Sequence, residues 1–109
     1  MPINTTHNKD DILITFTGRL DRSNDISLAV EVSKVTDKRF IVIDLSGVTH
    51  LDTNGIADIV NAQKSIEWKG GKACWVITSD HIKQVLGRTG VATLLEICDS
   101  VADAWERKS

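Results

Sequence analysis

The stretch Asp52-Thr53-Asn54-Gly55 places a carboxylate and a hydroxyl directly before a segment whose apolar residues recur at helical spacing, from Ile56 to Ile66. Polar capping residues in front of such a segment predict that a helix begins here. A helix N-terminus carries about half a positive charge and free N–H groups, which favour a bound anion. A hydroxyl at this position, such as that of Thr53, could therefore carry a phosphate without strain.

The same residues also have plainer interpretations. Thr53 can simply cap the helix, and the Asp52 carboxylate can simply favour the helix dipole. Asp52 could also be a phosphoacceptor, as in response-regulator receivers, which share a similar strand–loop–helix build. Receivers hold a divalent ion with an acidic pair just after their first strand. The pair Asp10-Asp11 precedes its predicted strand, which disfavours the receiver interpretation.

A catalytic site finds little support in the sequence. His50 lies close to Asp52, but no Ser or Cys in a nucleophile context accompanies it. Cys74 and Cys98 fall inside predicted strands and show no metal-ligand spacing with the histidines. We therefore expect a protein that is not an enzyme and that holds no metal and no cofactor.

The central stretch must be positioned by the elements around it. Residues 40–45 form a near-continuous apolar run, which is typical of a strand buried on both faces. We expect a short polar loop over 46–51 and then the helix, which the pair Gly70-Gly71 ends. In open α/β sheets, sites collect at the carboxyl ends of the strands, which is where Asp52 stands.

The N-terminal part predicts an antiparallel hairpin. Residues 3–7 indicate a short edge strand, and residues 12–17 indicate a second strand that ends at Gly18. The capping residues of 21–25 predict the start of a helix. The segment 26–35 that follows fits both strand alternation and helical spacing, with a small preference for helix.

The C-terminal part continues the alternation of strands and helices. We expect strands over 73–78 and 94–98, and short helices that Ser79 or Asp80 and Asp99 or Ser100 cap. Such alternation predicts one α/β domain over residues 1–109, with a mostly parallel sheet flanked by helices. We expect the three tryptophans to pack in or around the core. Exposure of Trp68, as an anchor for a partner, is the alternative.

Composition excludes several function classes. The chain has 109 residues, 41% of them hydrophobic and 26% charged, as in an ordinary soluble domain. A net charge of −2 argues against nucleic acid as a partner. No apolar run approaches the ~20 residues of a membrane-spanning helix, and the N-terminus does not resemble a signal peptide. We expect a cytoplasmic protein with buried free thiols rather than a disulfide.

Several motifs resemble those of the STAS family, named for sulfate transporters and anti-sigma factor antagonists. Asp52-Thr53-Asn54-Gly55 is similar to its Asp-Ser-Ser-Gly or Asp-Ser-Thr-Gly signature, and Gly18-Arg-Leu-Asp21 matches its Gly-x-Leu-Asp motif. Gly70-Gly71 and Thr89-Gly90-Val91 lie where the family has glycine turns. The resemblance implies a helix over 26–35, an antiparallel N-terminal edge on the mostly parallel mixed sheet, and about four helices.

The resemblance also implies a function and its residues. A family member of the antagonist type binds a serine-kinase-type anti-sigma factor and is phosphorylated on one of the two residues between Asp and Gly. Here these are Thr53 and Asn54, and Asn54 departs from the family because it cannot accept a phosphate. The implied partner-binding residues are Asp21, Asp52, Thr53, Asn54, Gly55 and Ile56.

The implied partners are the anti-sigma factor, which is also the kinase, and a cognate phosphatase. Phosphorylation at the Asp52–Gly55 loop would switch binding off. Two alternatives stay open. The chain could be the accessory subunit of a lipid-transport ATP-binding cassette complex, or a signalling scaffold that is never phosphorylated.

Overall fold

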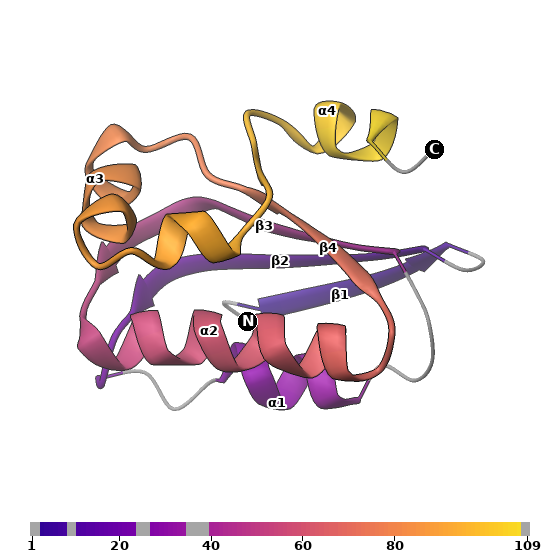
Figure 1. Cartoon of the computed structure of the whole chain (residues 1–109), viewed down its shortest axis with the longest axis horizontal. Coiled ribbons are helices and arrows are strands. Elements are labelled where there is room, and N and C mark those ends of the chain that lie inside the picture. Colours follow the sequence, from indigo (N-terminus) through magenta and orange to yellow (C-terminus); the bar gives the residue numbers. More distant parts are fainter. Residues whose placement is uncertain (1–2, 9–10, 24–26, 35–39, 108–109) are drawn as a thin grey trace.

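The computed structural model describes residues 3–8, 11–23, 27–34 and 40–107. A single five-stranded sheet forms the centre of the molecule, with its strands side by side in chain order (Figure 1). The strands are β1 (Ile3–Asn8), β2 (Asp11–Leu20), β3 (Phe40–Leu51), β4 (Lys72–Val76) and β5 (Ile97–Cys98). β1 is antiparallel to β2, and the other neighbouring pairs are parallel.

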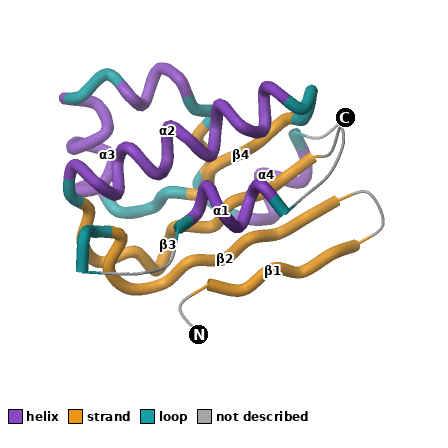
Figure 2. Tube along the Cα trace, turned by 90° about the horizontal axis from the view of Figure 1, so that it is seen from below, coloured by secondary structure: helices purple, strands orange, loops and turns teal. Residues whose placement is uncertain are grey.

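Helices lie on both faces of this sheet. They are α1 (Leu28–Ser33), α2 (Thr53–Trp68), α3 (Asp80–Arg88), the 3₁₀ helix η1 (Val91–Leu94) and α4 (Val101–Glu106). Figure 2, seen from below, shows α1 and α2 side by side on one face. The predicted α/β class, the mixed sheet with an antiparallel N-terminal edge and the four flanking helices are therefore confirmed among the described residues.

Two apolar layers, one on each side of the sheet, make the core. The larger layer joins alternate residues of the strands, such as Ile14 and Ile43, to α1, α2 and α3. The smaller layer lies under α4 and contains Val42 and the two cysteines. Because both faces are covered there, residues 40–45 of β3 and 73–76 of β4 are nearly continuous apolar runs, as is typical of a parallel strand buried on two sides.

The ends of β2 and β3 differ from the sequence prediction. The predicted polar loop over 46–51 is wrong, because β3 continues to Leu51, and β2 continues past Gly18 to Leu20. The two extensions pair with each other, up to Leu20 opposite Leu51, with two register shifts on the way. Backbone pairing between the strands thus outweighs the polar character of the side chains. Gly18 has φ 96°, which glycine adopts readily.

Two further boundaries were predicted wrongly. The helix expected to begin within 21–25 begins at Leu28 with Ser27 as its N-cap, although residues 24–26 lie outside the described ranges. The last strand, expected over 94–98, is only Ile97–Cys98, because η1 takes Val91–Leu94. The Thr93 hydroxyl donates to the Gly90 carbonyl and helps to hold this 3₁₀ turn.

Other local predictions are confirmed. The first hairpin is antiparallel, although residues 9–10 of its expected turn are outside the described part. Gly70, with φ 78°, follows the end of α2, and Ser79 and Ser100 cap α3 and α4. Within the described residues, no helix is long and apolar enough to span a membrane.

Candidate functional site

The candidate site lies where β2 and β3 end together. Because Leu20 pairs with Leu51, the residues that follow them, Asp21 and Asp52, come to the same edge of the sheet. α2 starts at this edge with Asp52 as its N-cap. Two motifs that are 30 residues apart in the sequence therefore form one site, as their place at the carboxyl ends of neighbouring parallel strands predicts.

Each oxygen of the Asp52 carboxylate accepts a hydrogen bond from the backbone. Oδ1 accepts a hydrogen bond from the Gly55 amide at 2.9 Å, which caps α2, and Oδ2 accepts one from the Arg22 amide at 3.2 Å. The bond from Gly55 is the main cause that lowers the pKa of Asp52 below its ordinary value of 3.8. Partial burial and the nearby charge of Asp21 act in the opposite direction. Asp52 is thus ionised at neutral pH and braces the segment that follows β2.

Gly55 is required by a close approach of α2 to β2. A β-carbon at this position would lie 1.9 Å from the Leu20 carbonyl oxygen, which is far inside van der Waals contact. Gly55 is buried, and Ile56 is partly buried and packs against the core. The glycine of the motif therefore sets how closely the first turn of α2 sits on the sheet.

Thr53 and Asn54 are the exposed members of the motif. The interpretation that Thr53 caps the helix is wrong, because Asp52 occupies the N-cap and Thr53 is the first helical residue. The Thr53 side chain is therefore presented to solvent on the first turn of α2. Its phosphorylation stays a prediction.

Asp21 forms a small network within the chain. Its Oδ2 accepts from the Arg19 side chain at 2.8 Å, and its Oδ1 accepts from the amide and the hydroxyl of Ser23. The Ser23 hydroxyl is the largest cause that lowers the pKa of Asp21. Asp21 thus holds the turn after β2, and its predicted contact with a partner stays a prediction.

Asp58 has a structural role that sequence reasoning missed. Its carboxylate accepts hydrogen bonds from the Ser27 hydroxyl at 2.8 Å and from the Leu28 and Ala29 amides at 2.6 and 3.0 Å. It thereby joins the middle of α2 to the start of α1. The signal available was Ser27 as a capping residue, but no spacing rule links it to a carboxylate so far along the chain.

The two thiols are buried, and the exposed His50 side chain lies beside a neighbouring hydroxyl. Cys74 and Cys98 are free and buried, as predicted, and burial, helped by Glu96, raises the pKa of Cys74 to about 12. The His50 Nδ1 lies 2.9 Å from the Thr49 hydroxyl oxygen. Among the described residues, no group of three His, Cys, Asp or Glu side chains is arranged to hold a metal.

The tryptophans divide between core and surface. Trp75 is buried and donates from Nε1 to the Gln63 side chain at 2.8 Å, and Trp105 stacks obliquely near Phe40, with ring centroids 5.8 Å apart. Trp68 is 91% exposed, so the expectation that it packs is wrong. It ends α2 at the opposite end of the helix from Thr53.

The sheet order, the capped helix start and the Asp-Thr-Asn-Gly turn together define a small α/β domain with a helix-terminal surface site. The family model described as the STAS domain matches residues 2–104, and the chain belongs to that family.

Comparison with individual proteins gives more distant likenesses. The chain is 21% identical over 107 residues to an anti-sigma F factor antagonist of Paenibacillus polymyxa, covering 95% of this chain and 92% of the relative. The structure of an anti-sigma factor antagonist from Mycobacterium paratuberculosis has a TM-score of 0.82 at 18% identity and covers 96% and 91% of the two chains. A sulfate transporter family protein from Wolinella succinogenes has a TM-score of 0.76 at 16% identity and covers 94% and 87%.

Proposed function

We propose that the chain is an anti-sigma factor antagonist, which binds a serine-kinase-type anti-sigma factor through the first turn of α2. The observation that carries the proposal is the exposure of Thr53 and Asn54 on a turn that Asp52 and Gly55 hold rigidly against the sheet. Membership of the STAS family and the named relative from Paenibacillus support it. By occupying the anti-sigma factor, the chain would free a sigma factor.

The protein would act by binding and not by catalysis. The high pKa of the Cys74 thiol leaves it protonated at neutral pH, which removes the thiolate that nucleophilic catalysis requires. Buried free thiols are also typical of the reducing cytoplasm, where sigma factors work. The purified protein should show no hydrolase or transferase turnover, and turnover abolished by His50→Ala or Asp52→Ala would overturn this part of the proposal.

Phosphorylation of Thr53 would be the switch. A phosphate adds about −1.5 to −2 charges, and the helix N-terminus favours such a charge in the free domain. A partner surface shaped for a neutral hydroxyl would have to desolvate this dianion without compensation, so affinity falls while the fold survives. A cognate phosphatase would restore binding.

The first test is to identify the acceptor. Thr53 is the only hydroxyl between Asp52 and Gly55, so incubation with the cognate kinase should phosphorylate Thr53 alone. Intact-mass and fragment analysis would measure this. Phosphate found only on Ser46, Thr49 or another residue would contradict the proposed switch.

The second test compares Thr53→Ala and Thr53→Glu for binding to the anti-sigma factor. Alanine should keep binding and abolish regulation. Glutamate should weaken binding about tenfold or more, which corresponds to ~1.4 kcal/mol, and should change folding by no more than ~1 kcal/mol. Ala102→Glu is the matched control, because it adds the same charge to the first turn of α4, on the opposite face of the sheet.

Other results would favour other functions. If Ala and Glu at Thr53 impair assembly equally and no phosphorylated form occurs in cells, an accessory subunit of a lipid-transport complex or a scaffold fits better. If neither substitution affects binding, the first turn of α2 is not the interface.

A further inference from the structure

Two carboxylates, the N-cap Asp52 and Asp58 of α2, contact the described residues that follow β2 and that begin α1. Asp52 accepts the Arg22 amide at the start of this segment, and Asp58 accepts three hydrogen bonds at its end, from Ser27, Leu28 and Ala29. The Ser27 hydroxyl, while donating to Asp58, accepts the Val30 amide at 3.2 Å. The first turn of α1 is therefore capped by a serine that is itself held by α2.

α1 depends on these contacts for its position. It has six residues, which is too short for a helix to be stable without tertiary contacts. Leu28 and Val32 are buried and fix one side of the helix against the core. Asp58 fixes its N-terminal end, through hydrogen bonds to a charged acceptor, which are stronger than neutral ones.

The part of this surface that α2 contributes is poor in charge. The exposed residues of α2 from its start to position 61 are all uncharged: Thr53, Asn54, Ala57 and Asn61. α1, which lies beside α2, exposes Val30 to 57% (Figure 2). Depletion of charge with an accessible apolar side chain is the composition found at the centre of protein–protein interfaces.

We propose that Asp58 is a positioning residue, which fixes α1, and with it Val30, relative to Thr53, so that the anti-sigma factor meets one surface made from both helices. This inference rests on the proposed function and names a further part of the same binding surface. Val30 is the apolar contact on α1, and Asp58 acts through it without touching the partner. The serine-kinase-type anti-sigma factor is the occupant because Asp58 places the start of α1 beside α2, whose first turn is the proposed binding site of that partner.

A double-mutant cycle tests the inference. The dissociation constant for the purified anti-sigma factor is measured for the unchanged chain, Val30→Ser, Asp58→Ala and the double variant. Each single substitution should weaken binding about fivefold to tenfold. Once Asp58 is gone, Val30 is no longer held in place, so the double variant should bind about as weakly as Asp58→Ala alone.

Controls separate positioning from stability. Ser100→Ala removes the N-cap of α4, another six-residue helix, on the opposite face of the sheet, and it should lower Tm without weakening binding. Asp58→Asn and Ser27→Ala are milder variants in case Asp58→Ala does not fold. In Asp58→Asn one oxygen can still accept from Ser27 and Ala29, so its loss of affinity should be smaller. Hydrogen exchange of the Leu28 and Ala29 amides should quicken in step with the loss of affinity.

The outcomes are distinct. No binding by the unchanged chain would overturn the proposed function, and this inference with it. Two results would overturn this inference alone, provided that the unchanged chain binds. One is that the losses of affinity for Val30→Ser and Asp58→Ala multiply in the double variant. The other is that Val30→Ser causes no loss. A loss of affinity in Ser100→Ala equal to that in Asp58→Ala would also overturn it.

Discussion

The two ends of α2 are held in different ways. At its start, Asp52 caps the helix and Gly55 allows contact with the Leu20 carbonyl, so the first turn is fixed by particular side chains. At its end, the Gly71 amide donates to the Ile66 carbonyl and the Gly70 amide to the Glu67 carbonyl, both at 2.9 Å. This is a Schellman motif, which stops a helix through its backbone.

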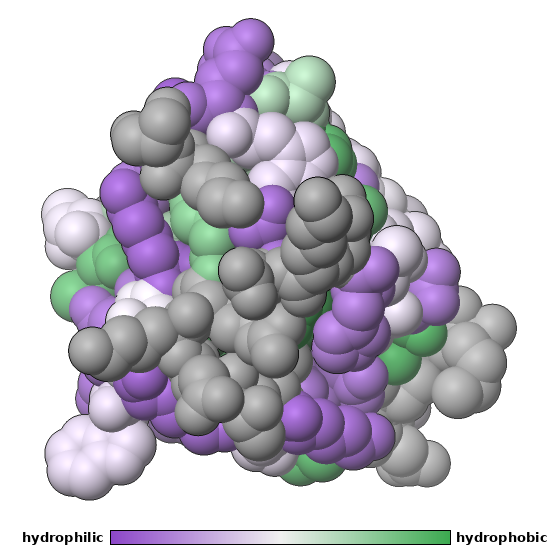
Figure 3. All heavy atoms as spheres, turned by 90° about the vertical axis from the view of Figure 1, so that its right-hand side faces the viewer, coloured by the Kyte–Doolittle hydropathy of each residue, from purple (hydrophilic) through white to green (hydrophobic). Residues whose placement is uncertain are grey.

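The contacts at the start of α2 fix the position of its first turn, whereas those at its end only stop the helix. Trp68, next to the Schellman motif, is almost fully exposed, and Lys69 reaches the Ser33 carbonyl at 3.0 Å. Viewed from this end of the molecule, hydrophilic side chains make up much of the coloured surface, with only small hydrophobic patches (Figure 3). Of the two ends of α2, only the Thr53 end presents exposed residues on a turn that particular side chains hold in place.

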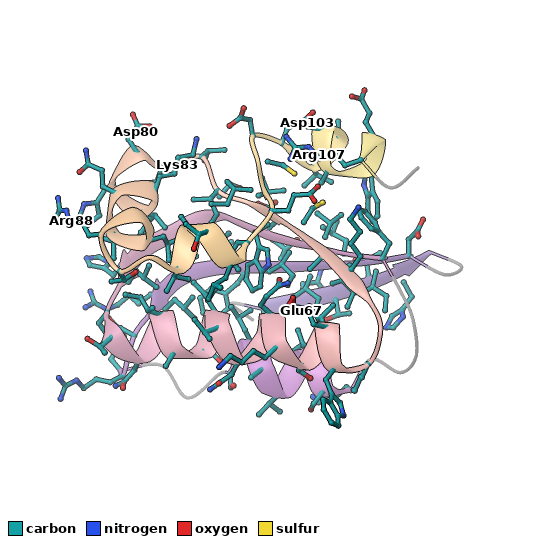
Figure 4. All side chains as sticks on the ribbon, in the orientation of Figure 1. Glu67, Asp80, Lys83, Arg88, Asp103 and Arg107 are labelled. Carbon is teal, nitrogen blue, oxygen red and sulfur yellow. The ribbon has the colours of Figure 1, made fainter. Side chains whose placement is uncertain are left out.

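The exposed ion pairs elsewhere in the molecule, like the contacts at the end of α2, do little to fix a position. Asp103 of α4 and Arg107, its C-cap, lie side by side (Figure 4). Lys83 of α3 reaches Asp99 at 3.3 Å. Such exposed pairs contribute little to stability, typically less than ~1 kcal/mol.

Of the substitutions that test this difference between the two ends, Gly55→Ala should lower the stability most. Its new β-carbon would collide with the Leu20 carbonyl, and the resulting shift should cost about 3 kcal/mol of unfolding free energy. Gly87→Ala in α3 is the control, because a β-carbon there meets nothing within 4 Å. It should stabilise the protein by about 0.5–1 kcal/mol. Urea unfolding of both variants measures this, and equal effects would show that the close approach is unimportant.

Asp52→Asn should have a smaller effect, which depends on pH. The amide keeps one acceptor for Gly55 but cannot serve the Arg22 amide equally well. Because the folded-state pKa of Asp52 is lowered, its stabilisation is present above the ordinary value of 3.8 and is lost as pH falls through the folded pKa. The unchanged chain should therefore have the higher urea midpoint at neutral pH. The difference should close below about pH 3.8, and a difference that widens in acid would contradict the assignment.

Asn54→Ser should change stability by less than ~1 kcal/mol, since both residues are tolerated at the start of a helix. Asn54 is exposed and does not cap α2, so little packing is lost. Thermal unfolding checks the stability, and mass analysis after kinase treatment checks whether the new serine becomes a second acceptor. A much larger loss would mean that Asn54 also holds the first turn.

Trp68→Ala should have the smallest effect, within about 0.5 kcal/mol, as is usual for an exposed side chain. The same change should remove the most solvent-exposed part of the tryptophan emission, because Trp75 is buried and Trp105 is partly buried. Unfolding curves followed by circular dichroism give the stability independently of fluorescence. A loss above ~1 kcal/mol would show that this end is held by more than its backbone.

Much of the site could be predicted from local sequence, and the remainder depends on pairing between distant segments. The strand at residues 40–45 and the helix beginning at Asp52 follow from apolar pattern and capping chemistry. The extension of β3 to Leu51 depends on β2, and no property of residues 46–51 alone indicates it. Asp58 was missed for the same reason, because its hydrogen-bond donors lie some 30 residues earlier in the chain. The exposure of Trp68 went against the usual burial of tryptophan.

The order of the strands in the sheet has a consequence for how the chain folds. Because β1 to β5 lie side by side in chain order, each strand pairs with the edge left by the strand before it, and none has to insert between two others. During synthesis, which proceeds from the N-terminus, the sheet can therefore grow one edge at a time as the chain emerges. The edge that Asp52 occupies is complete once β3 is paired, so the surface around Thr53 can form before β5 and α4 have been made.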